Sequence, residues 1–399
     1  MSIISKKINV IQNSVTLNIS ARISELKQQN IDVISLSAGE PEFNTAINIQ
    51  NAAIKAMKSG MTRYTEISGI KELKTAICNK LKYENEIEYN EKEVIICNGA
   101  KHALYNLLAS TVNECDEVII IKPYWVSYTA MAKIVGAKIV FLETSIEKGF
   151  RINLQELDNK INENTKWLIL NSPNNPTGVI YSYEELLSIA DIIYKHPKLN
   201  IICDNTYEKI IFNNMKFYNL AMVAPKLRDR IFIINSVSKS YAMTGWRIGY
   251  CIGNAEIIAA MNKLQSHTTS NACSISQFAA LEAIEGKQDY IKNYVNNWEK
   301  KTTLLLKYLK QLGFQCYKPE GTFYLFPNIS TLFGKETPKG KMIQSSQDLA
   351  IYLLNEALVS VVPGSAFGAD EYIRISSTVD ETLIEKSYLK IEQAIEKLK

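Results

Sequence analysis

The sequence lacks the cysteine pairs that build disulfide frameworks and zinc sites. Its 399 residues include seven cysteines, an odd number, and no two of them form a Cys-x-x-Cys motif. Thiols scattered in this way are typical of reduced side chains in a cytoplasmic protein. We therefore expect neither a disulfide frame nor a metal site, and we place the protein in the cytoplasm.

Long apolar runs and an excess of one charge are also missing. No apolar run approaches the roughly 18 residues of a membrane helix, and no cationic, apolar leader opens the chain. Lys and Arg number 45 against 41 Asp and Glu, and the net charge of +4 is spread along the chain. Because nucleic-acid binding needs clustered Lys and Arg, we expect neither a membrane nor a nucleic-acid partner.

The length and the order of predicted elements indicate two domains. A chain of 399 residues exceeds one ordinary hydrophobic core. Over residues 45–290 predicted strands alternate with helices, which is typical of an α/β fold with a mostly parallel sheet covered on both faces. Residues 1–44 and 291–399 favour a smaller α+β domain. A long helical stretch is expected over about Ile275 to Leu312.

Five chemically distinctive residues stand at the ends of predicted strands. Each lies at or just beyond the carboxyl end of an apolar run: Gly99, Trp125, Asn175, Asp204 and Lys239. Ligands of open α/β sheets bind at that edge of the sheet. Chance is a poor explanation for five such placements, so we expect these residues to line one site.

The segment Asn235 to Tyr250 (NSVSKSYAMTGWRIGY) carries the reactive candidate. Lys239 lies among hydroxyl residues that include Ser236, and Arg247 follows eight positions later. A partly buried amine near other cations has a lowered pKa and can attack a carbonyl, while arginine and serine can hold a phosphate. The pattern favours pyridoxal phosphate, although a plain strand–loop–strand with an incidental lysine has the same spacing.

The other candidates have two interpretations each. Gly99 could expose backbone N–H groups to an anion at a helix start, or serve a simple turn; Gly39 could bring backbone close to a ligand, or form a tight turn. Trp125 could stack on a flat ring or cap a core. Asp204 needs either a cation, such as a pyridinium nitrogen, or structural hydrogen bonds. Arg374 could bind a substrate carboxylate or be an edge-strand charge.

Nine segments together resemble the class I pyridoxal-phosphate aminotransferases, in the aspartate aminotransferase branch common in bacteria. They follow the family's order over nearly the whole chain: SAGEPEF, YTEISGI, NGAKHAL, PYWVSY, NSPNNPTG, DNTYE, SVSKSYAMTGWRIGY, VVPGSAFG and YIRIS. The lysine block and NNPTG are highly specific together. The resemblance implies the fold type I of pyridoxal-phosphate-dependent transferases, the cofactor pyridoxal 5'-phosphate, and a homodimer whose subunits share active sites.

The resemblance also implies roles for the residues around the cofactor ring. Lys239 is expected to bind the cofactor covalently and later to move the substrate proton. Asp204 is expected to keep the ring nitrogen protonated, which makes the ring an electron sink. Tyr207 and Asn175 would hydrogen-bond the phenolic oxygen. Trp125 would lie against the ring and border the substrate.

Phosphate and substrate contacts follow from the same resemblance. The expected phosphate ligands are Gly99, Ala100, Lys101, Ser236, Arg247 and Tyr64 of the partner subunit. The substrate α-carboxylate is assigned to Arg374, together with Gly39 and Asn175.

Two segments depart from the family pattern. DNTYE has Asn205 and Thr206 where a Glu-Ile pair is usual, which changes the packing of the loop but keeps Asp204 and Tyr207. The turn NGAKHAL has Ala100 where a second glycine or a serine is frequent. Ala100 can therefore offer the phosphate only its backbone N–H.

Substrate choice depends on few residues. Lys101 could pair with the side-chain carboxylate of aspartate or glutamate, or meet only phosphate or solvent. Our hypothesis is a ping-pong aspartate:2-oxoglutarate aminotransferase. Gln12 stands where relatives that use prephenate carry a basic residue; it can hydrogen-bond a carboxylate but has no charge, so prephenate amination is a further activity to test.

Three alternatives remain. The first is an aminotransferase for aromatic amino acids, alanine or kynurenine, and the second is a C–S lyase of the same family. The third is a transcription regulator, which would need an added basic segment of ~60 or more residues. We expect no room for such a segment in this chain.

Overall fold

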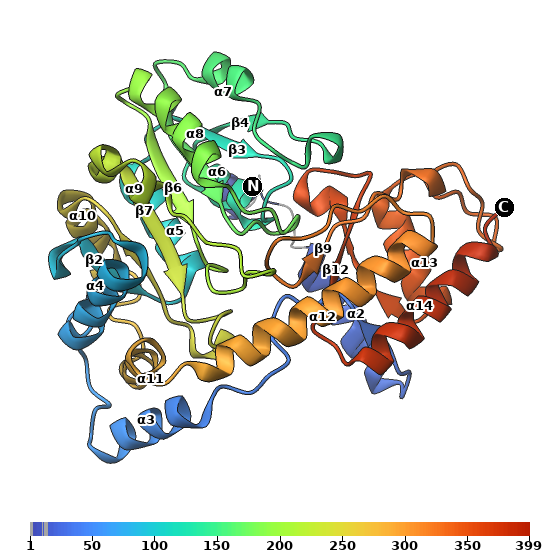
Figure 1. The fold of residues 1–399 in the computed structure, drawn as a ribbon, viewed down its shortest axis with the longest axis horizontal. Helices are drawn as coiled ribbons and strands as arrows, with labels where there is room; N and C mark the ends of the chain where they lie inside the picture. Colours follow the sequence, from blue (N-terminus) through green and yellow to red (C-terminus); the bar gives the residue numbers. More distant parts are fainter. Residues whose placement is uncertain (1–2, 10, 12–14) are drawn as a thin grey trace.

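The computed structural model of the protein describes residues 3–9, 11 and 15–399 (Figure 1). A sheet of seven strands within these residues forms the centre of the larger lobe. Its strands are β2 (Val94–Cys97), β3 (Glu117–Ile121), β4 (Lys138–Leu142), β5 (Thr165–Asn171), β6 (Asn200–Asp204), β7 (Ile231–Ser236) and β8 (Gly249–Ile252). The strand order is β2-β8-β7-β6-β5-β3-β4, and only β8 runs opposite in direction to the other six strands. The predicted mostly parallel mixed sheet is confirmed.

Helices cover both faces of this sheet. They are α3 (Ile47–Lys58), α4 (Lys71–Asn85), α5 (Ala100–Thr111), α6 (Ser127–Ile134), α7 (Leu154–Lys160), α8 (Tyr183–Lys195), α9 (Leu220–Val223), α10 (Ala255–Ser266) and α11 (Ser274–Glu285). Successive side chains of a strand point to opposite faces. In β2, accordingly, Val94 and Ile96 join the core with α4, α8 and α11, whereas Ile95 and Cys97 join the core with α5, α6 and α10.

A smaller lobe holds the C-terminal part of the chain together with residues 15–35 (Figure 1). Its elements are α2 (Val15–Gln28), β1 (Ile34–Ser35), α12 (Asp289–Gln311), β9 (Tyr324–Leu325), α13 (Ser346–Glu356), β10 (Val359–Ser360), β11 (Val362–Pro363), β12 (Ile373–Ser376) and α14 (Glu381–Glu396). The short helix α1 (Lys6–Asn9) instead contacts α6 of the larger lobe. Strands β11, β12 and β9 form an antiparallel sheet, and β1 pairs with β10 in parallel. This lobe has its own apolar cluster, and α12 runs from one lobe to the other (Figure 1). The domain boundaries at residues 44/45 and 290/291 stay a prediction.

The long helical stretch expected over about Ile275 to Leu312 is two helices instead. The break falls between α11 and α12, where Gly286 adopts an extended backbone. The side chain of Gln288 donates to the carbonyls of Ala283 and Ile284 at 3.0 and 2.7 Å. Because these carbonyls belong to the last turn of α11, the glutamine caps the helix and the chain turns before α12.

Two shorter findings complete the fold. The strand expected over Ile31 to Leu36 shrinks to the two residues of β1. In the described ranges every cysteine is a free thiol, and no helix there is both long and apolar enough to cross a membrane.

Candidate active site

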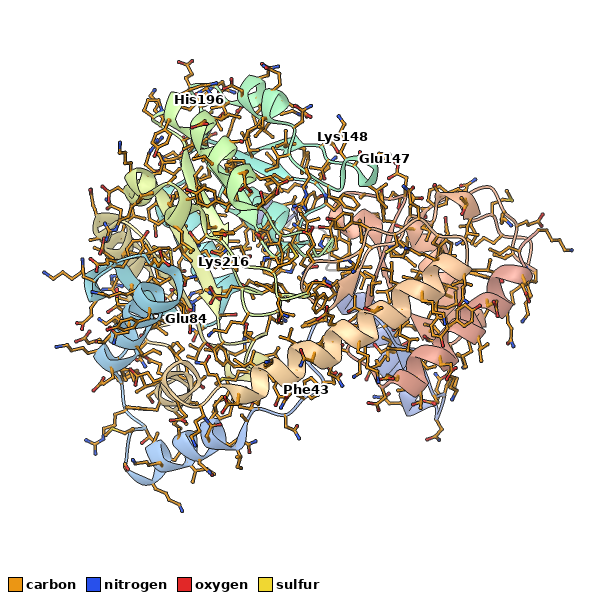
Figure 2. The ribbon with its side chains drawn as sticks, in the orientation of Figure 1. Phe43, Glu84, Glu147, Lys148, His196 and Lys216 are labelled. Atoms are coloured by element: carbon orange, nitrogen blue, oxygen red, sulfur yellow. The ribbon has the colours of Figure 1, made fainter. Side chains whose placement is uncertain are left out.

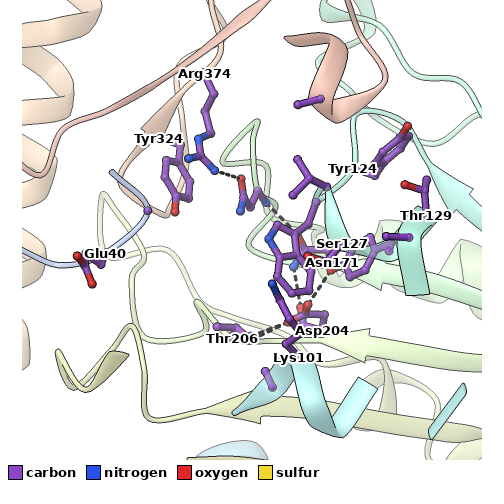
Figure 3. A pocket seen from close by; sticks show the side chains of 18 of the residues that line it. Glu40, Lys101, Tyr124, Ser127, Thr129, Asn171, Asp204, Thr206, Tyr324 and Arg374 are labelled. Atoms are coloured by element: carbon purple, nitrogen blue, oxygen red, sulfur yellow. Dashed lines mark hydrogen bonds between the residues drawn. The ribbon is translucent and has the colours of Figure 1, made fainter. Parts of the chain in front are cut away.

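A cavity of about 1240 Å³ lies at the carboxyl edge of the large sheet, facing the smaller lobe (Figure 3). The neighbouring strands β5, β6 and β7 are parallel and end there. Most of the predicted site residues line the cavity: Gly39, Ala100, Lys101, Trp125, Asn175, Asp204, Tyr207, Ser236, Lys239, Arg247 and Arg374. The strand ends thus bring together residues that are far apart in the sequence.

Lys239 follows β7 and points its amine into the space between the lobes. Its Nζ donates to the backbone carbonyl of Gly39. Burial lowers the pKa of this amine to about 8, Arg374 and more distant cations contribute, and Glu40 opposes the shift. A substantial neutral fraction at physiological pH is the condition for a nucleophilic amine.

Asp204 ends β6 and is buried beneath the cavity (Figure 3). Its carboxylate accepts hydrogen bonds from the Tyr128 hydroxyl at 2.7 Å and from the Thr206 hydroxyl and N–H at 2.8 and 3.2 Å. Burial nevertheless raises the pKa of Asp204, since it outweighs these bonds. Among the described residues no cation forms an ion pair with Asp204, so this carboxylate can take a cationic N–H from a ligand.

Arg374 is a buried cation that also has no carboxylate partner in the described part of the chain. Its Nη1 donates to Asn175 Oδ1 at 3.1 Å and its Nη2 to the carbonyl of Ser37 at 3.2 Å, while Nε has no partner there. The guanidinium lies 4.2 Å from the ring centre of Tyr324, whose hydroxyl is 3.1 Å from that of Tyr207. A guanidinium held in this way is ready for a ligand carboxylate.

The turn before α5 forms a concave backbone next to Arg247. Gly99 has φ +86°, and a Cβ at this position would collide with the Arg247 guanidinium. A Cβ on Gly249 would collide with the backbone N of Ala100. Arg247 is held by donating to the carbonyl of Thr244 at 2.8 Å. Helix N–H groups, a guanidinium and Ser236 near one cavity wall suit a phosphate.

Cations outnumber carboxylates around the cavity. The charged side chains among the described lining residues are Lys101, Lys133, Lys239, Arg247 and Arg374, against Glu40 and Asp204, which leaves 5 − 2 = +3. Burial, and then Arg247, lower the pKa of Lys101. A positive cavity with one buried carboxylate fits a cofactor that carries a phosphate and a protonated ring, with positive charge left over for the carboxylates of a substrate. The residues therefore fit pyridoxal phosphate.

The structure is consistent with both interpretations of Trp125, packing in the core and lining the ligand site. The indole packs edge-on against Tyr128, with ring centres 5.3 Å apart, and so belongs to the core. It also lines the cavity, and Lys101 Nζ lies 5.1 Å from its ring centre. A cation over an indole face is held in place without losing its charge.

Two of the predicted residues that the structure describes, Tyr64 and Gly99, are not among the residues that line the cavity. Tyr64 is 91% exposed and does not line the cavity of its own chain. Gln12 lies outside the described residues. Gly99 contributes through its contact with Arg247.

Sequence reasoning missed Tyr128, Thr206 and Tyr324, which hold Asp204 and Tyr207. The sequence did offer a clue to Tyr128, because it follows Trp125 by three residues and so can lie on the same face of a helix. The sequence offered no clue to Tyr324, since this residue belongs to β9 and lies 117 residues beyond Tyr207, the residue it contacts.

The unusual Asn205 acquires a structural role. Its Nδ2 donates to the carbonyl of Ser172 at 3.0 Å, and its Oδ1 accepts from Asn219. The loop after β6 is therefore fixed to its neighbours on this side.

The segment after Lys239 is tied to the N-terminal part of the chain. Trp246 Nε1 donates to Thr45 Oγ1 at 2.9 Å, and Thr45 Oγ1 donates to the carbonyl of Ala242 at 2.7 Å. Thr244 Oγ1 donates to Glu40 Oε2 at 2.9 Å. We call these three hydrogen bonds the 40–45 strap; it fixes the turn that precedes Arg247.

Known proteins resemble this chain over its whole length. The family described as aminotransferase class I and II matches residues 31–388. A probable aspartate/prephenate aminotransferase of Rickettsia felis is 48% identical, over 99% of this chain and 97% of that protein. An aspartate aminotransferase of Bacillus subtilis is 42% identical, over 99% of each.

Solved structures agree with the sequence relatives. The aspartate aminotransferase from Rhizobium meliloti superposes with a TM-score of 0.96 at 38% identity and covers 100% of both chains. The enzyme from Thermus thermophilus with maleate gives a TM-score of 0.92 at 32% identity, over 99% of this chain and 100% of that one. The fold and family that the motifs predicted are confirmed: this chain belongs to the aminotransferase class I and II family.

Proposed function

We propose that this aminotransferase uses pyridoxal 5'-phosphate to move the amino group of L-aspartate to 2-oxoglutarate, giving oxaloacetate and L-glutamate. The observation that carries the proposal is the pair of cations at the cavity that no carboxylate of the described chain neutralises, Arg374 and Lys101. Both substrates are dicarboxylates, so one cation is available for each carboxylate. The Rickettsia and Bacillus relatives are named for aspartate, and the Thermus relative was solved with maleate, itself a dicarboxylate.

When bound, pyridoxal phosphate supplies an aldehyde that exchanges amines and a ring that withdraws electrons. Lys239 would hold the cofactor and, once free, take the proton from the substrate Cα with its neutral Nζ. Asp204 would hold a proton on the ring nitrogen. Tyr207 and Asn175 would donate to the phenolic oxygen, while Trp125 excludes water from the ring face.

The remaining assignments concern the two anionic ends of the site. The phosphate would be held by Ser236, Arg247 and the backbone N–H groups of the turn at Gly99, Ala100 and Lys101. At the other end Arg374 and Asn175 would orient the α-carboxylate, and the absent side chain of Gly39 leaves room for it. A Cβ on Gly39 would lie 3.3 Å from the hydroxyl of Tyr324 and so narrow this space.

The covalent role of Lys239 has a direct test. Lys239→Ala should abolish the visible absorbance of the bound cofactor, because no amine remains to join its aldehyde. Another lysine that lines the cavity offers a control. Lys133→Met removes a lysine to which no contact with the cofactor is assigned, so it should keep the absorbance. Visible absorbance that persists in the Lys239→Ala protein would refute the assignment.

Donor specificity is tested by steady-state assays of aspartate, tyrosine, alanine and kynurenine with 2-oxoglutarate. Aspartate should be among the best donors, and Lys101→Met should lower kcat/KM for aspartate while leaving alanine nearly unchanged. If aspartate ranks with the poor donors, the proposal fails. Release of pyruvate from cystathionine would instead indicate a C–S lyase.

Prephenate is a second candidate acceptor, because the Rickettsia felis relative is named an aspartate/prephenate aminotransferase. The test is amination of prephenate by aspartate in the same assay. Gln12→Lys adds the charge that this position lacks, so it should improve prephenate use if Gln12 contacts that substrate.

We further propose a cytoplasmic homodimer in which Tyr64 of the partner subunit completes the phosphate site. Tyr64 is 91% exposed, and three apolar side chains that shortly precede it in the sequence are 42–48% exposed, namely Ile54, Met57 and Met61. An exposed apolar surface of this kind favours a protein interface. Residues 45–290 would form the large domain of each subunit, and residues 1–44 with 291–399 the small one.

Subunit mixing tests the shared site. Tyr64→Ala and Lys239→Ala proteins are each expected to be impaired. A hybrid dimer regains one site with both side chains, so activity should rise on mixing and refolding. Unchanged activity in verified hybrids would contradict the shared site.

A further inference from the structure

Four charged side chains form a cluster outside the cavity, where the turn after β6 meets the end of α4. Lys80 Nζ pairs with Glu208 at 2.6 Å and with Glu84 at 3.3 Å. Lys209 Nζ pairs with Glu84 at 2.8 Å. We call these four residues the α4 charge cluster; Figure 2 shows Glu84 on α4, in the lobe of the large sheet.

The inner pair of this cluster is nearly removed from solvent. The side chains of Lys80 and Glu208 are 3% and 9% exposed. Burial alone would lower the pKa of Lys80, but Glu208 and Glu84 outweigh it and raise that pKa, so the ammonium stays charged. A buried ion pair adds little net stability compared with well-packed apolar residues. Its better-supported use is to fix one arrangement of the chain, here the turn after β6 that contains Glu208.

That turn carries Tyr207. Glu208 N donates to the carbonyl of Asn205 at 2.9 Å, and Ile210 N donates to that of Tyr207 at 2.8 Å. On the one side Asn205 is fixed to Ser172, as described above. On the other side Glu208 is fixed to α4 by the cluster. Tyr207 therefore lies between two anchored residues.

The cluster also borders the segment of Lys239. Tyr241, two residues further on, is fully buried, and its ring centre is 5.9 Å from Lys209 Nζ. Its hydroxyl has no hydrogen-bond partner among the described residues. The segment is thus packed against the cluster without being hydrogen-bonded to it, whereas the turn of Tyr207 is directly ion-paired to it.

We propose that the α4 charge cluster is a positioning device for the hydroxyl of Tyr207. The inference rests on the proposed function, in which that hydroxyl donates to the phenolic oxygen of the cofactor. A donated hydrogen bond stabilises the anionic form of this oxygen and so lowers the pH at which the bound cofactor's visible absorbance changes. Hydrogen bonds weaken steeply with misalignment, so a loosened turn raises that pH.

The test uses Lys80→Met in the cofactor-loaded protein, because methionine keeps an unbranched chain of similar length and removes the ammonium group with its charge and its N–H donors. The pH midpoint of the absorbance change should move up by roughly half a unit or more. Tyr207→Phe should move it in the same direction, and adding Lys80→Met to Tyr207→Phe should move it no further. The affinity of the cofactor-free protein for pyridoxal phosphate should fall in parallel.

Two matched variants separate positioning from general destabilisation. Lys82→Met removes an exposed lysine of the same helix, which pairs with Glu88 at 2.9 Å, and should leave the midpoint unchanged. Lys80→Arg keeps the charge and should restore most of the wild-type midpoint. If Lys80→Met does not fold, Glu208→Gln, which keeps the side-chain shape, should show the same upward shift.

Distinct results would overturn the inference. A Lys80→Met or Glu208→Gln protein with a lowered Tm but the wild-type midpoint would show a purely structural cluster. Additive shifts in the double variant would show that the cluster acts through something other than Tyr207. A wild-type protein without visible absorbance on cofactor addition would overturn the proposed function, and the positioning role with it.

Discussion

Replacing Tyr128 by phenylalanine removes one of the three hydrogen bonds that the carboxylate of Asp204 accepts from described residues. The change keeps the ring, so it opens no cavity in the core around α6. Both partners are buried, and the bond measures 2.7 Å. A hydrogen bond to a charged group contributes about 1.5–3 kcal/mol. The carboxylate form of Asp204 loses this amount of stabilisation.

The loss converts into a pKa change. At 1.36 kcal/mol per unit, the pKa of Asp204, already raised by burial, should rise by about one to two further units. A more basic Asp204 competes for the proton on the ring nitrogen. We expect kcat/KM for aspartate to fall by roughly 10- to 100-fold, since the fall reflects the same free energy.

The assay combines steady-state kinetics with a measurement of the protonation of the cofactor's ring nitrogen. Steady-state kcat/KM should be measured for Tyr128→Phe, and 15N NMR with labelled cofactor should report less protonation at the ring nitrogen. Tyr89→Phe is the control, because its buried hydroxyl has no hydrogen-bond partner among the described residues. If Tyr128→Phe keeps wild-type kcat/KM and the 15N shift is unchanged, the hydrogen bond to Asp204 does not tune the site.

Three more predictions follow from individual residues. The rate at which cofactor-free protein captures pyridoxal phosphate should rise with pH and level off above about 8, because the neutral amine of Lys239 is the reacting form; stopped-flow absorbance checks this, and a flat profile contradicts it. Arg374→Lys keeps the charge but loses the paired N–H donors, so KM for amino donors should rise about 10- to 100-fold with a smaller change in cofactor affinity. Gly99→Ala should weaken cofactor binding more than Gly136→Ala, measured by equilibrium titration. Both glycines have φ near +87°, but only Gly99 meets Arg247, so equal effects would refute the role of that contact.

Strand-end chemistry was predictable because it depends on local signals. Apolar runs locate β5, β6 and β7, and the rule that parallel strands end at one edge gathers Asn175, Asp204 and Lys239 there. Motif order then supplied the family. These inferences need no knowledge of which segments cross in space.

The partners of these residues could not be predicted in the same way. Tyr324 meets Tyr207, and Thr45 meets Trp246, across more than a hundred residues of sequence. Such contacts depend on how distant segments of the chain pack in three dimensions, which no periodicity of the sequence encodes. The break before α12 escaped notice for a related reason, since the side chain that caps α11 comes from Gln288, beyond the helix it ends.

The 40–45 strap joins the two ends of the site. Its hydrogen bonds connect the turn of Arg247 to the segment that begins at Gly39, and this segment faces Arg374. A ligand that orders one end therefore spares part of the ordering cost at the other. Coupling of this kind is reciprocal. A phosphate bound near Arg247 should raise the affinity for a dicarboxylate, and the dicarboxylate should raise the affinity for the phosphate by the same factor. We therefore expect a change in the strap to alter the affinity for the cofactor and the affinity for the substrate together.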